Sequence, residues 1–180
     1  METVALYSAY CGSADCFAVR NPERLVCGVV GIIHKTDGSI FDEKADALVN
    51  PVNCVGAMGA GLALQFKKRF AENFDAYAAA CEQGRVKTGE MFVFETGSLF
   101  PKFIINFPTE NHYRDKSRIE YIESGLSALT REIETRAIKS IAIPALGCGL
   151  GGLDWKEVKP LIINAFENIN GVEVVVFEPR

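Results

Sequence analysis

Long hydrophobic runs are missing from this sequence of 180 residues. None reaches the roughly 18 consecutive apolar residues that a membrane-spanning helix needs, so we expect no membrane span and no membrane partner. The chain also lacks a lysine-led hydrophobic segment at its start, of the kind that directs secretion. We therefore expect a cytoplasmic location.

An excess of positive charge is missing as well. Nineteen Lys and Arg residues stand against 23 Asp and Glu residues, which gives a net charge of −4. This balance argues against a protein that wraps its whole surface in nucleic acid, although it allows a local basic patch. With 48% hydrophobic residues the chain can build a real core, and its length suits a single domain.

Cysteines are few and scattered, at positions 11, 16, 27, 54, 81 and 148. A chain of this size needs no disulfides, so reduced thiols are expected. Cys11, Cys16, Cys27 and His34 follow one another in the sequence, but their spacing matches no closed zinc pattern. We expect neither a metal nor a bound cofactor.

Segments with strand-like and helical patterns alternate along the chain. Strands are expected at 29–35, from 47, at 90–96, 102–107, 140–146 and 172–177, and helices at about 62–70, 74–83, 117–136 and 154–169. Capping boxes at Ser117-x-x-Glu120 and Asp154-x-x-Glu157 open the last two helices. The pattern indicates the α/β class, with a parallel or mixed sheet covered on both faces. Residues 1–28 are predicted to be an N-terminal extension of unclear role, and residues 29–180 the folded domain.

A glycine-rich loop follows the buried strand that starts at Ala47. Asn50 and Asn53 lie at the end of that strand, and three glycines precede a helix that starts at about Leu62: Gly56, Gly59 and Gly61. The loop is neither a Walker A motif nor Gly-x-Gly-x-x-Gly. Free N–H groups of the first helical turn and the helix dipole favour an anion there. The alternative is a tight strand-to-helix turn.

A second glycine loop follows the apolar strand IAIPAL and contains Gly147, Gly149, Gly151 and Gly152. Ligands of such folds bind outside the carboxyl ends of the strands, where both loops are expected. The sequence therefore predicts one cleft with a phosphate-binding loop on either side.

The chain contains three longer motifs: GAMGAGLALQFK, NFPT followed by His112-Tyr113-Arg114, and PALGCGLGGLDW. Together with VNPVN they resemble the macrodomain, an ADP-ribose-binding module, from about residue 32 to 177. Within this family the motifs are similar to one branch. That branch contains the DarG-type antitoxins, which remove ADP-ribose from thymidine bases in DNA, and the terminal ADP-ribose glycohydrolase. It implies a three-layer α/β/α macrodomain with a central mixed sheet.

The resemblance further implies a hydrolase that releases ADP-ribose from a modified acceptor, by this likeness a DNA base. The alternatives are a non-catalytic reader of ADP-ribosylated targets and a deacylase acting on O-acetyl-ADP-ribose or protein esters. The implied partners are ADP-ribose, ADP-ribosylated DNA or protein, and a cognate ADP-ribosyltransferase toxin. The expected state is a monomer.

The same resemblance names the site. Asn53, Glu110 and His112 are the candidate catalytic residues, and Tyr113 or Phe177 could stack on adenine or on the departing base. For Asn50 and Asn53 the alternative role is to cap and form turns. The implied ligand-binding residues are Ser39, Ile40, Asn50, Asn53, Met58, Gly59, Ala60, Gly61, Leu62, Pro144, Ala145, Gly147, Cys148, Gly149, Leu150, Gly151 and Phe177.

Two positions depart from the branch. Glu110 stands where the branch has a lysine that takes part in attack on the anomeric carbon; a glutamate could instead act as a general base on water, or mark a site that binds without cutting. Ser39 stands where an aspartate is expected to bind the adenine amino group, and Asp37 is a candidate substitute.

Three further features have two interpretations each. Cys54 and Cys148, in the two loops, are candidate nucleophiles or small buried hydrophobic residues. His112 is a general acid or phosphate contact, or an exposed loop residue. Arg114, Lys116 and Arg118 form a basic cluster that either binds nucleic-acid phosphates or is simply solvated.

Overall fold

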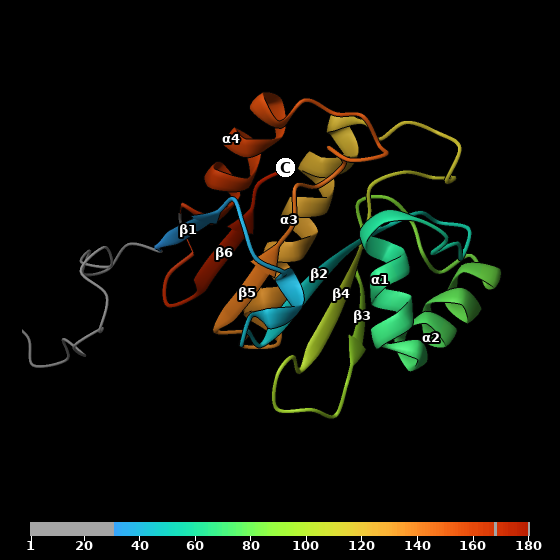
Figure 1. Cartoon of the computed structure of the whole chain (residues 1–180), viewed down its shortest axis with the longest axis horizontal. Helices are drawn as coiled ribbons and strands as arrows, with labels where there is room; N and C mark the ends of the chain where they lie inside the picture. Colours follow the sequence, from blue (N-terminus) through green and yellow to red (C-terminus); the bar gives the residue numbers. More distant parts are fainter. Residues whose placement is uncertain (1–30, 168, 180) are drawn as a thin grey trace, which may run out of the picture.

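The computed structural model describes residues 31–167 and 169–179. The predicted extension, residues 1–28, lies outside these ranges, and so do Cys11, Cys16 and Cys27. Six strands form one mixed sheet in the described part, in the order β1-β6-β5-β2-β4-β3 (Figure 1). The strands are β1 (Ile32–Lys35), β2 (Ala47–Val52), β3 (Phe92–Glu95), β4 (Phe103–Pro108), β5 (Ser140–Ile143) and β6 (Glu173–Phe177).

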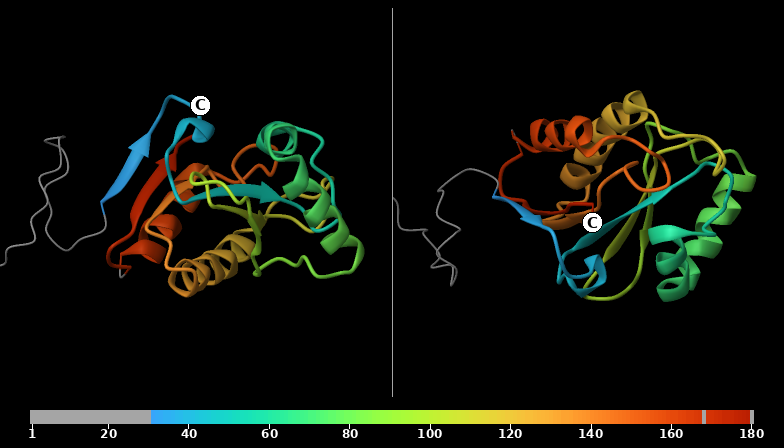
Figure 2. Two further views of the ribbon diagram at one scale, coloured as in Figure 1. Left: turned by 90° about the horizontal axis from the view of Figure 1, so that it is seen from below. Right: turned by 45° about the horizontal axis from the view of Figure 1, so that its top comes forward.

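Neighbouring strands are parallel, except that β3 and β4 form an antiparallel hairpin. The helices are η1 (Ile40–Asp42, a 3-10 turn), α1 (Gly61–Arg69), α2 (Ala71–Glu82), α3 (Ile119–Thr135) and α4 (Trp155–Phe166). Helices lie on both sides of the sheet, as Figure 2 shows. The predicted α/β fold with a central mixed sheet is confirmed.

The two faces of the sheet follow from the alternation of side chains along β2. Ala47 and Val49 pack into the core beneath α3 and α4, whereas Leu48 packs against Phe66 of α1 and Ile40 of η1. All three β2 side chains are fully buried. A smaller cluster fixes α2 near the end of β2 through Val52 and Tyr77.

Asp46 ties the amino ends of three strands together. Its Oδ2 accepts a hydrogen bond from Lys139 N at 2.8 Å, its Oδ1 lies 3.0 Å from Lys102 Nζ, and its N–H donates to Ser140 Oγ at 2.9 Å. Burial on its own would raise the pKa of Asp46, but the hydrogen bonds from Lys139 and Lys102 bring the pKa below its usual value. The opposite, carboxyl-end edge of the sheet carries the glycine loops.

Several boundaries differ from the sequence prediction. Strand β5 ends at Ile143 instead of Leu146, because Pro144 has no N–H to donate to the sheet. Helix α4 ends at Phe166, three residues early. The capping box at Ser117 is wrong: the N-cap of α3 is Arg118, and it contributes no side-chain hydrogen bond. By contrast, the cap at Asp154 is confirmed, since its Oδ1 accepts from Lys156 N at 2.9 Å.

Candidate functional site

The first glycine loop leads from β2 into α1 with an uncapped helix start. Gly56 and Gly61 have φ values of +77° and +57°, which favour glycine because a Cβ atom is strained there. The N-cap Ala60 gives no side-chain hydrogen bond, and the first helical bond runs from Leu64 N to Ala60 O at 3.1 Å. The amides of the first turn are therefore not taken by a capping side chain, as an anion site requires.

Asn53 shapes this loop from the inside. Its Oδ1 accepts hydrogen bonds from Val55 N at 3.1 Å and Ala57 N at 3.2 Å, and its Nδ2 donates to Ala57 O at 2.7 Å. The hydroxyl of Tyr77 lies 2.7 Å from Asn53 O and 3.0 Å from Oδ1. These bonds support the turn-forming role. A contact between Asn53 and a ribose stays a prediction.

A chain of three buried asparagines lies below the loop. Asn50 faces Asn106 across β2 and β4, and its Nδ2 donates to Asn106 Oδ1 at 2.9 Å. Asn106 Nδ2 in turn donates to Asn73 Oδ1 on α2 at 2.7 Å. Met58 covers Asn50, with its sulfur 3.7 Å from Nδ2, and both residues are buried. The network joins β2, β4 and α2 beneath the glycine loop, and ligand contacts by Asn50 and Met58 stay predictions.

The second glycine loop runs from Pro144 and Ala145 to Asp154 and is closed by its own backbone. Leu153 N donates to Gly147 O at 3.0 Å, and Gly152 N to Gly149 O at 3.2 Å. Gly147 has a φ of +71°. At the tip of this loop Leu150 is 74% exposed.

The two loops approach one another at Leu150. A Cβ atom on Gly61 would lie 3.8 Å from Leu150 Cδ1, so the tip of the second loop reaches the start of α1. Gly59 and Gly149, in contrast, have no atom within 4 Å of the place where a Cβ would stand. Both loops thus meet each other and still leave open space over one glycine each.

The segment after β4, residues 109–118, contacts both loops. Cys54 N donates to Asn111 O at 3.0 Å in the first loop, and Ser117 N donates to Gly151 O at 3.1 Å in the second. Lys116 Nζ adds a bond to Leu150 O at 3.3 Å. This acceptor loop, as we call residues 109–118, carries Glu110 and His112 and places them beside the region that the glycine loops share.

Glu110 is half-buried at the start of the acceptor loop. Burial raises the pKa of its carboxyl group above the usual value, the charge of Asp115 raises it further, and Lys116 partly opposes the shift. A glutamate with a raised pKa is a stronger base than an exposed one. A half-buried carboxyl group with a raised pKa suits a proton acceptor; the catalytic role of Glu110 stays a prediction.

His112 lies two residues after Glu110 in the acceptor loop. Its Nδ1 accepts a hydrogen bond from Arg114 N at 3.2 Å, and its ring lies 4.1 Å from that of Tyr113, which is 51% exposed. With Nδ1 engaged, Nε2 is the ring nitrogen that could serve a substrate. Val55, Tyr113 and Leu150, one from each loop, are all exposed large apolar residues.

The thiols of Cys54 and Cys148 are poor nucleophiles. Burial raises the pKa of each to about 11, so almost none is thiolate at neutral pH. Cys148 Sγ lies 3.4 Å from Leu146 O. These environments favour the interpretation as small buried hydrophobic residues.

The predicted adenine end lies on the α1 side of the sheet. Phe177 ends β6 and packs in the same cluster as Ile40 and Leu62. Ser39 is the N-cap of η1, and its Oγ accepts from Phe41 N at 3.4 Å. The structure therefore brings Ile40, Phe177 and Leu62 together from three distant segments.

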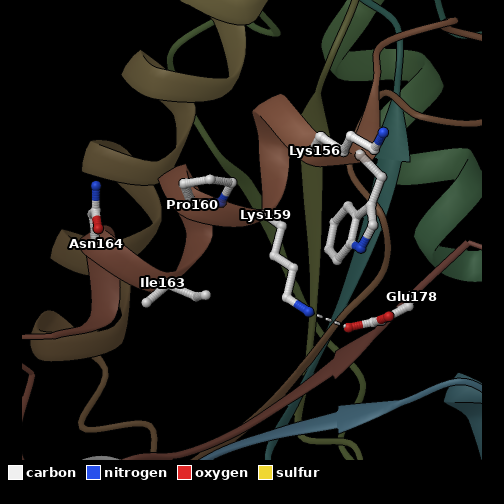
Figure 3. Close-up of a pocket in the computed structure, with 7 residues that line it drawn as sticks. Lys156, Lys159, Pro160, Ile163, Asn164 and Glu178 are labelled. Atoms are coloured by element: carbon white, nitrogen blue, oxygen red, sulfur yellow. Dashed lines mark hydrogen bonds and ion pairs between the residues drawn. The ribbon is translucent and has the colours of Figure 1, made fainter.

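Two cavities lie near this edge of the sheet. One, of about 570 Å³, runs along α4 on the other face, where Lys159 Nζ lies 2.7 Å from Glu178 Oε1 (Figure 3). It holds none of the predicted ligand residues. The other, of about 520 Å³, lies between the acceptor loop and α3 and is lined by Asn111, Asp115, Lys116, Ser117, Arg118 and Tyr121.

Sequence reasoning missed Ser117, Asn106 and Tyr77. The sequence predicts Ser117 as a helix cap, but its side chain is buried against the second glycine loop, and its Oγ has no hydrogen-bond partner. Asn106 stands inside the strand motif NFPT, where a polar residue in an apolar run was the available signal. Tyr77 lies on an apolar helix face, and nothing in the local sequence indicates that its hydroxyl bonds to Asn53.

Residues 49–162 match the Macro domain family. A DNA ADP-ribosyl glycohydrolase of Thermus aquaticus is 50% identical over 143 residues, which are 79% of this chain and 40% of the relative. The macrodomain of Mycobacterium tuberculosis DarG superposes with a TM-score of 0.82 at 47% identity, covering 84% of this chain and 99% of that structure.

A third match is Thermosipho africanus DarTG in complex with ADP-ribose, with a TM-score of 0.75 and 33% identity over 79% of this chain and 40% of that one. The chain spans about 40% of the length of the curated relatives that it matches first. In the described residues, no helix has the length and apolar character to cross a membrane. Those residues also hold no group of three metal-binding side chains.

Proposed function

The chain belongs to the macrodomain family, and we propose that it binds ADP-ribose and hydrolyses the bond between ADP-ribose and a thymidine base of DNA. Two glycine loops that meet at Leu150 and leave open space over Gly59 and Gly149 carry this proposal. The family match, a relative named DNA ADP-ribosyl glycohydrolase at 50% identity and a neighbour in complex with ADP-ribose support it.

In the proposed complex the diphosphate lies between the two loops. Amides of the first turn of α1 and of the second loop donate to its oxygens, and the dipole of α1 adds favourable potential. The adenine lies toward Ile40 and Phe177, and the distal ribose toward Asn53 and the acceptor loop. The exposed apolar residues Val55, Tyr113 and Leu150, one from each loop, exclude water from the departing thymine.

Glu110 acts as the general base. Its carboxylate takes a proton from a water molecule whose oxygen attacks the anomeric carbon, while the bond from that carbon to the base breaks. The electron pair stays on the thymine, which receives a proton from His112 or from the newly protonated Glu110. The products are free ADP-ribose and unmodified DNA.

The physiological setting that we propose is the reversal of a modification made by an ADP-ribosyltransferase toxin. One relative, from Thermosipho africanus, is named as a fusion of DNA ADP-ribosyl transferase and DNA ADP-ribosyl glycohydrolase. Such a fusion supports a working pair in which one protein adds the group and the other removes it.

The loop geometry predicts the effect of adding a methyl group at the two open glycines. Gly59→Ala and Gly149→Ala should leave the free energy of unfolding within about 0.5 kcal/mol of the wild type, because the new Cβ atoms meet nothing. ADP-ribose affinity should fall about tenfold, since the backbone could no longer approach the diphosphate. Thermal shift measures both quantities.

With ADP-ribose at a hundred times its dissociation constant, the wild type should gain about 2.7 kcal/mol of stability. At the same concentration the alanine variants should gain about 1.4 kcal/mol. No gain for the wild type would contradict ADP-ribose binding. Equal gains for all three proteins would show that the diphosphate does not lie between these loops.

Three substrates separate the proposed reaction from its alternatives. We expect release of ADP-ribose from a thymidine-ADP-ribosylated oligonucleotide, and little from a glutamate-linked protein or from O-acetyl-ADP-ribose. Product formation is measured by chromatography of free ADP-ribose. Turnover of the esters alone would indicate a deacylase, and binding without turnover of any substrate would indicate a reader.

A further inference from the structure

The cavity between the acceptor loop and α3 is not used by any part of ADP-ribose in the proposed complex. It measures about 520 Å³ and is lined by the side of the acceptor loop and the first turn of α3. Among its lining residues are two cations, Lys116 and Arg118, and one carboxylate, Asp115. The cavity therefore carries a positive balance although the whole chain is negative.

Its position relates it directly to the scissile bond. Asp115 and Lys116, which line it, belong to the same short loop as Glu110, the proposed base, and Lys116 Nζ also donates to Leu150 O at the tip of the second glycine loop. A substrate whose modified base lies at Glu110 thus has its next covalent neighbours within reach of this cavity. In a DNA strand those neighbours are a phosphodiester group and the adjacent nucleotide.

The cavity also has an aromatic wall. Asn111 Nδ2 donates to the hydroxyl of Tyr121 at 3.0 Å, which fixes the ring, and the Arg118 guanidinium lies 5.9 Å from the ring centre. A guanidinium offers several N–H donors to phosphate oxygens, and a tyrosine face can stack with any base. Cation and ring together suit a nucleotide better than an isolated anion.

We propose that this cavity is a second subsite, which binds the phosphodiester group next to the modified thymidine through Arg118 and Lys116 and the adjacent base against Tyr121. This inference rests on the proposed function. It assigns recognition of the DNA strand to the acceptor loop and recognition of ADP-ribose to the glycine loops. An ADP-ribosylated nucleoside without flanking phosphates would then be recognised only by the glycine loops.

Arg118→Gln tests the subsite, with Arg131→Gln as the matched control. Both positions are exposed arginines at or in α3, but Arg131 lines neither cavity. Binding of a short fluorescent thymidine oligonucleotide is followed by anisotropy from about 50 to about 200 mM salt. Arg118→Gln should weaken binding about threefold to tenfold at low salt and reduce the slope of log affinity against log salt by about 0.7. Arg131→Gln should behave as the wild type.

Asp115→Asn supplies a change of opposite sign. Removing the carboxylate should strengthen binding of the same oligonucleotide, because the cavity becomes more positive.

A kinetic experiment compares an ADP-ribosylated oligonucleotide with the ADP-ribosylated nucleoside. Arg118→Gln should lower kcat/KM for the oligonucleotide about tenfold and leave kcat/KM for the nucleoside unchanged.

Equal behaviour of Arg118→Gln and Arg131→Gln toward the oligonucleotide would overturn the subsite. So would a selective loss on an ADP-ribosylated protein, which would assign the cavity to a protein acceptor. If the wild type released no ADP-ribose from any substrate, the proposed function would fail. The salt titration would still decide whether Arg118 binds a DNA phosphate.

Discussion

Replacing Glu110 by glutamine is expected to slow release of ADP-ribose from modified DNA by about a hundredfold to ten-thousandfold, the usual contribution of a general base. Glutamine has nearly the shape of glutamate but cannot accept the proton from water. ADP-ribose binding should be retained, because the predicted diphosphate contacts come from the two glycine loops. Single-turnover kinetics and a thermal shift with ADP-ribose measure the two effects separately.

The pH dependence of the wild type follows from the same carboxyl group. Its pKa is raised by burial and by Asp115, and only the deprotonated form can act as a base. kcat/KM should therefore rise with pH through this raised pKa, and as the pH is lowered its loss should begin at a higher pH than an ordinary glutamate would give. Asp115→Asn removes one cause of the raised pKa and should move the profile toward lower pH.

Glu110→Lys distinguishes a working glutamate from a silenced site. The related branch has a lysine at this position, so the substitution restores the residue of the branch. If Glu110 is the base, the lysine variant should be slower than the wild type. A gain of activity on ADP-ribosylated DNA would show instead that glutamate had silenced a lysine-dependent site, and the base role of Glu110 would be abandoned.

The sequence predicted those parts of the fold that depend on local pattern. The apolar run at Ala47 became the buried strand β2, and the helical spacing of Ile122, Leu126, Leu129 and Ile133 became the buried face of α3. Glycine loops after strands could be placed because the carboxyl ends of parallel strands share one edge. Local composition alone was sufficient for these elements.

What the sequence could not predict depends on contacts between distant segments. Asn50 and Asn106 pair only because β2 and β4 lie in register, 56 residues apart. Ser117 is of a residue type that often caps helices, but its backbone N–H donates to Gly151 O and places it against the second glycine loop. The raised pKa of Glu110 likewise depends on burial in the folded chain, which no local pattern predicts.

The packing of Ser117 explains why we expect a substitution at Gly151 to have a large effect on stability and binding. A Cβ atom on Gly151 would lie 2.6 Å from Gly147 O and 2.8 Å from Ser117 Cβ, and it would also collide with Ser117 Oγ. The loop is closed at this point by the bond from Ser117 N to Gly151 O, so it cannot move away without losing that bond. Gly151 is therefore required because the acceptor loop packs directly on it.

Gly151→Ala should lower the free energy of unfolding by about 3 kcal/mol, as overpacking of a closed site does, and should abolish measurable ADP-ribose binding. Chemical denaturation and thermal shift with ADP-ribose check the two effects. Gly149→Ala is the matched control, because a Cβ there meets no atom within 4 Å and its stability should be unchanged. A stable Gly151→Ala that binds ADP-ribose normally would contradict the packing.

A second substitution at Ser117 shows whether the clash is the cause. Ser117→Ala alone should be nearly neutral, since the Oγ that it removes has no hydrogen-bond partner. Ser117→Gly, measured alone and combined with Gly151→Ala, removes both Ser117 side-chain contacts to the new Cβ and leaves the contact to Gly147 O. The double variant should therefore recover part, but not all, of the stability that Gly151→Ala loses, a non-additivity of about 1 kcal/mol or more in a double-mutant cycle. Strict additivity would mean that residues 117 and 151 do not couple the acceptor loop to the second glycine loop.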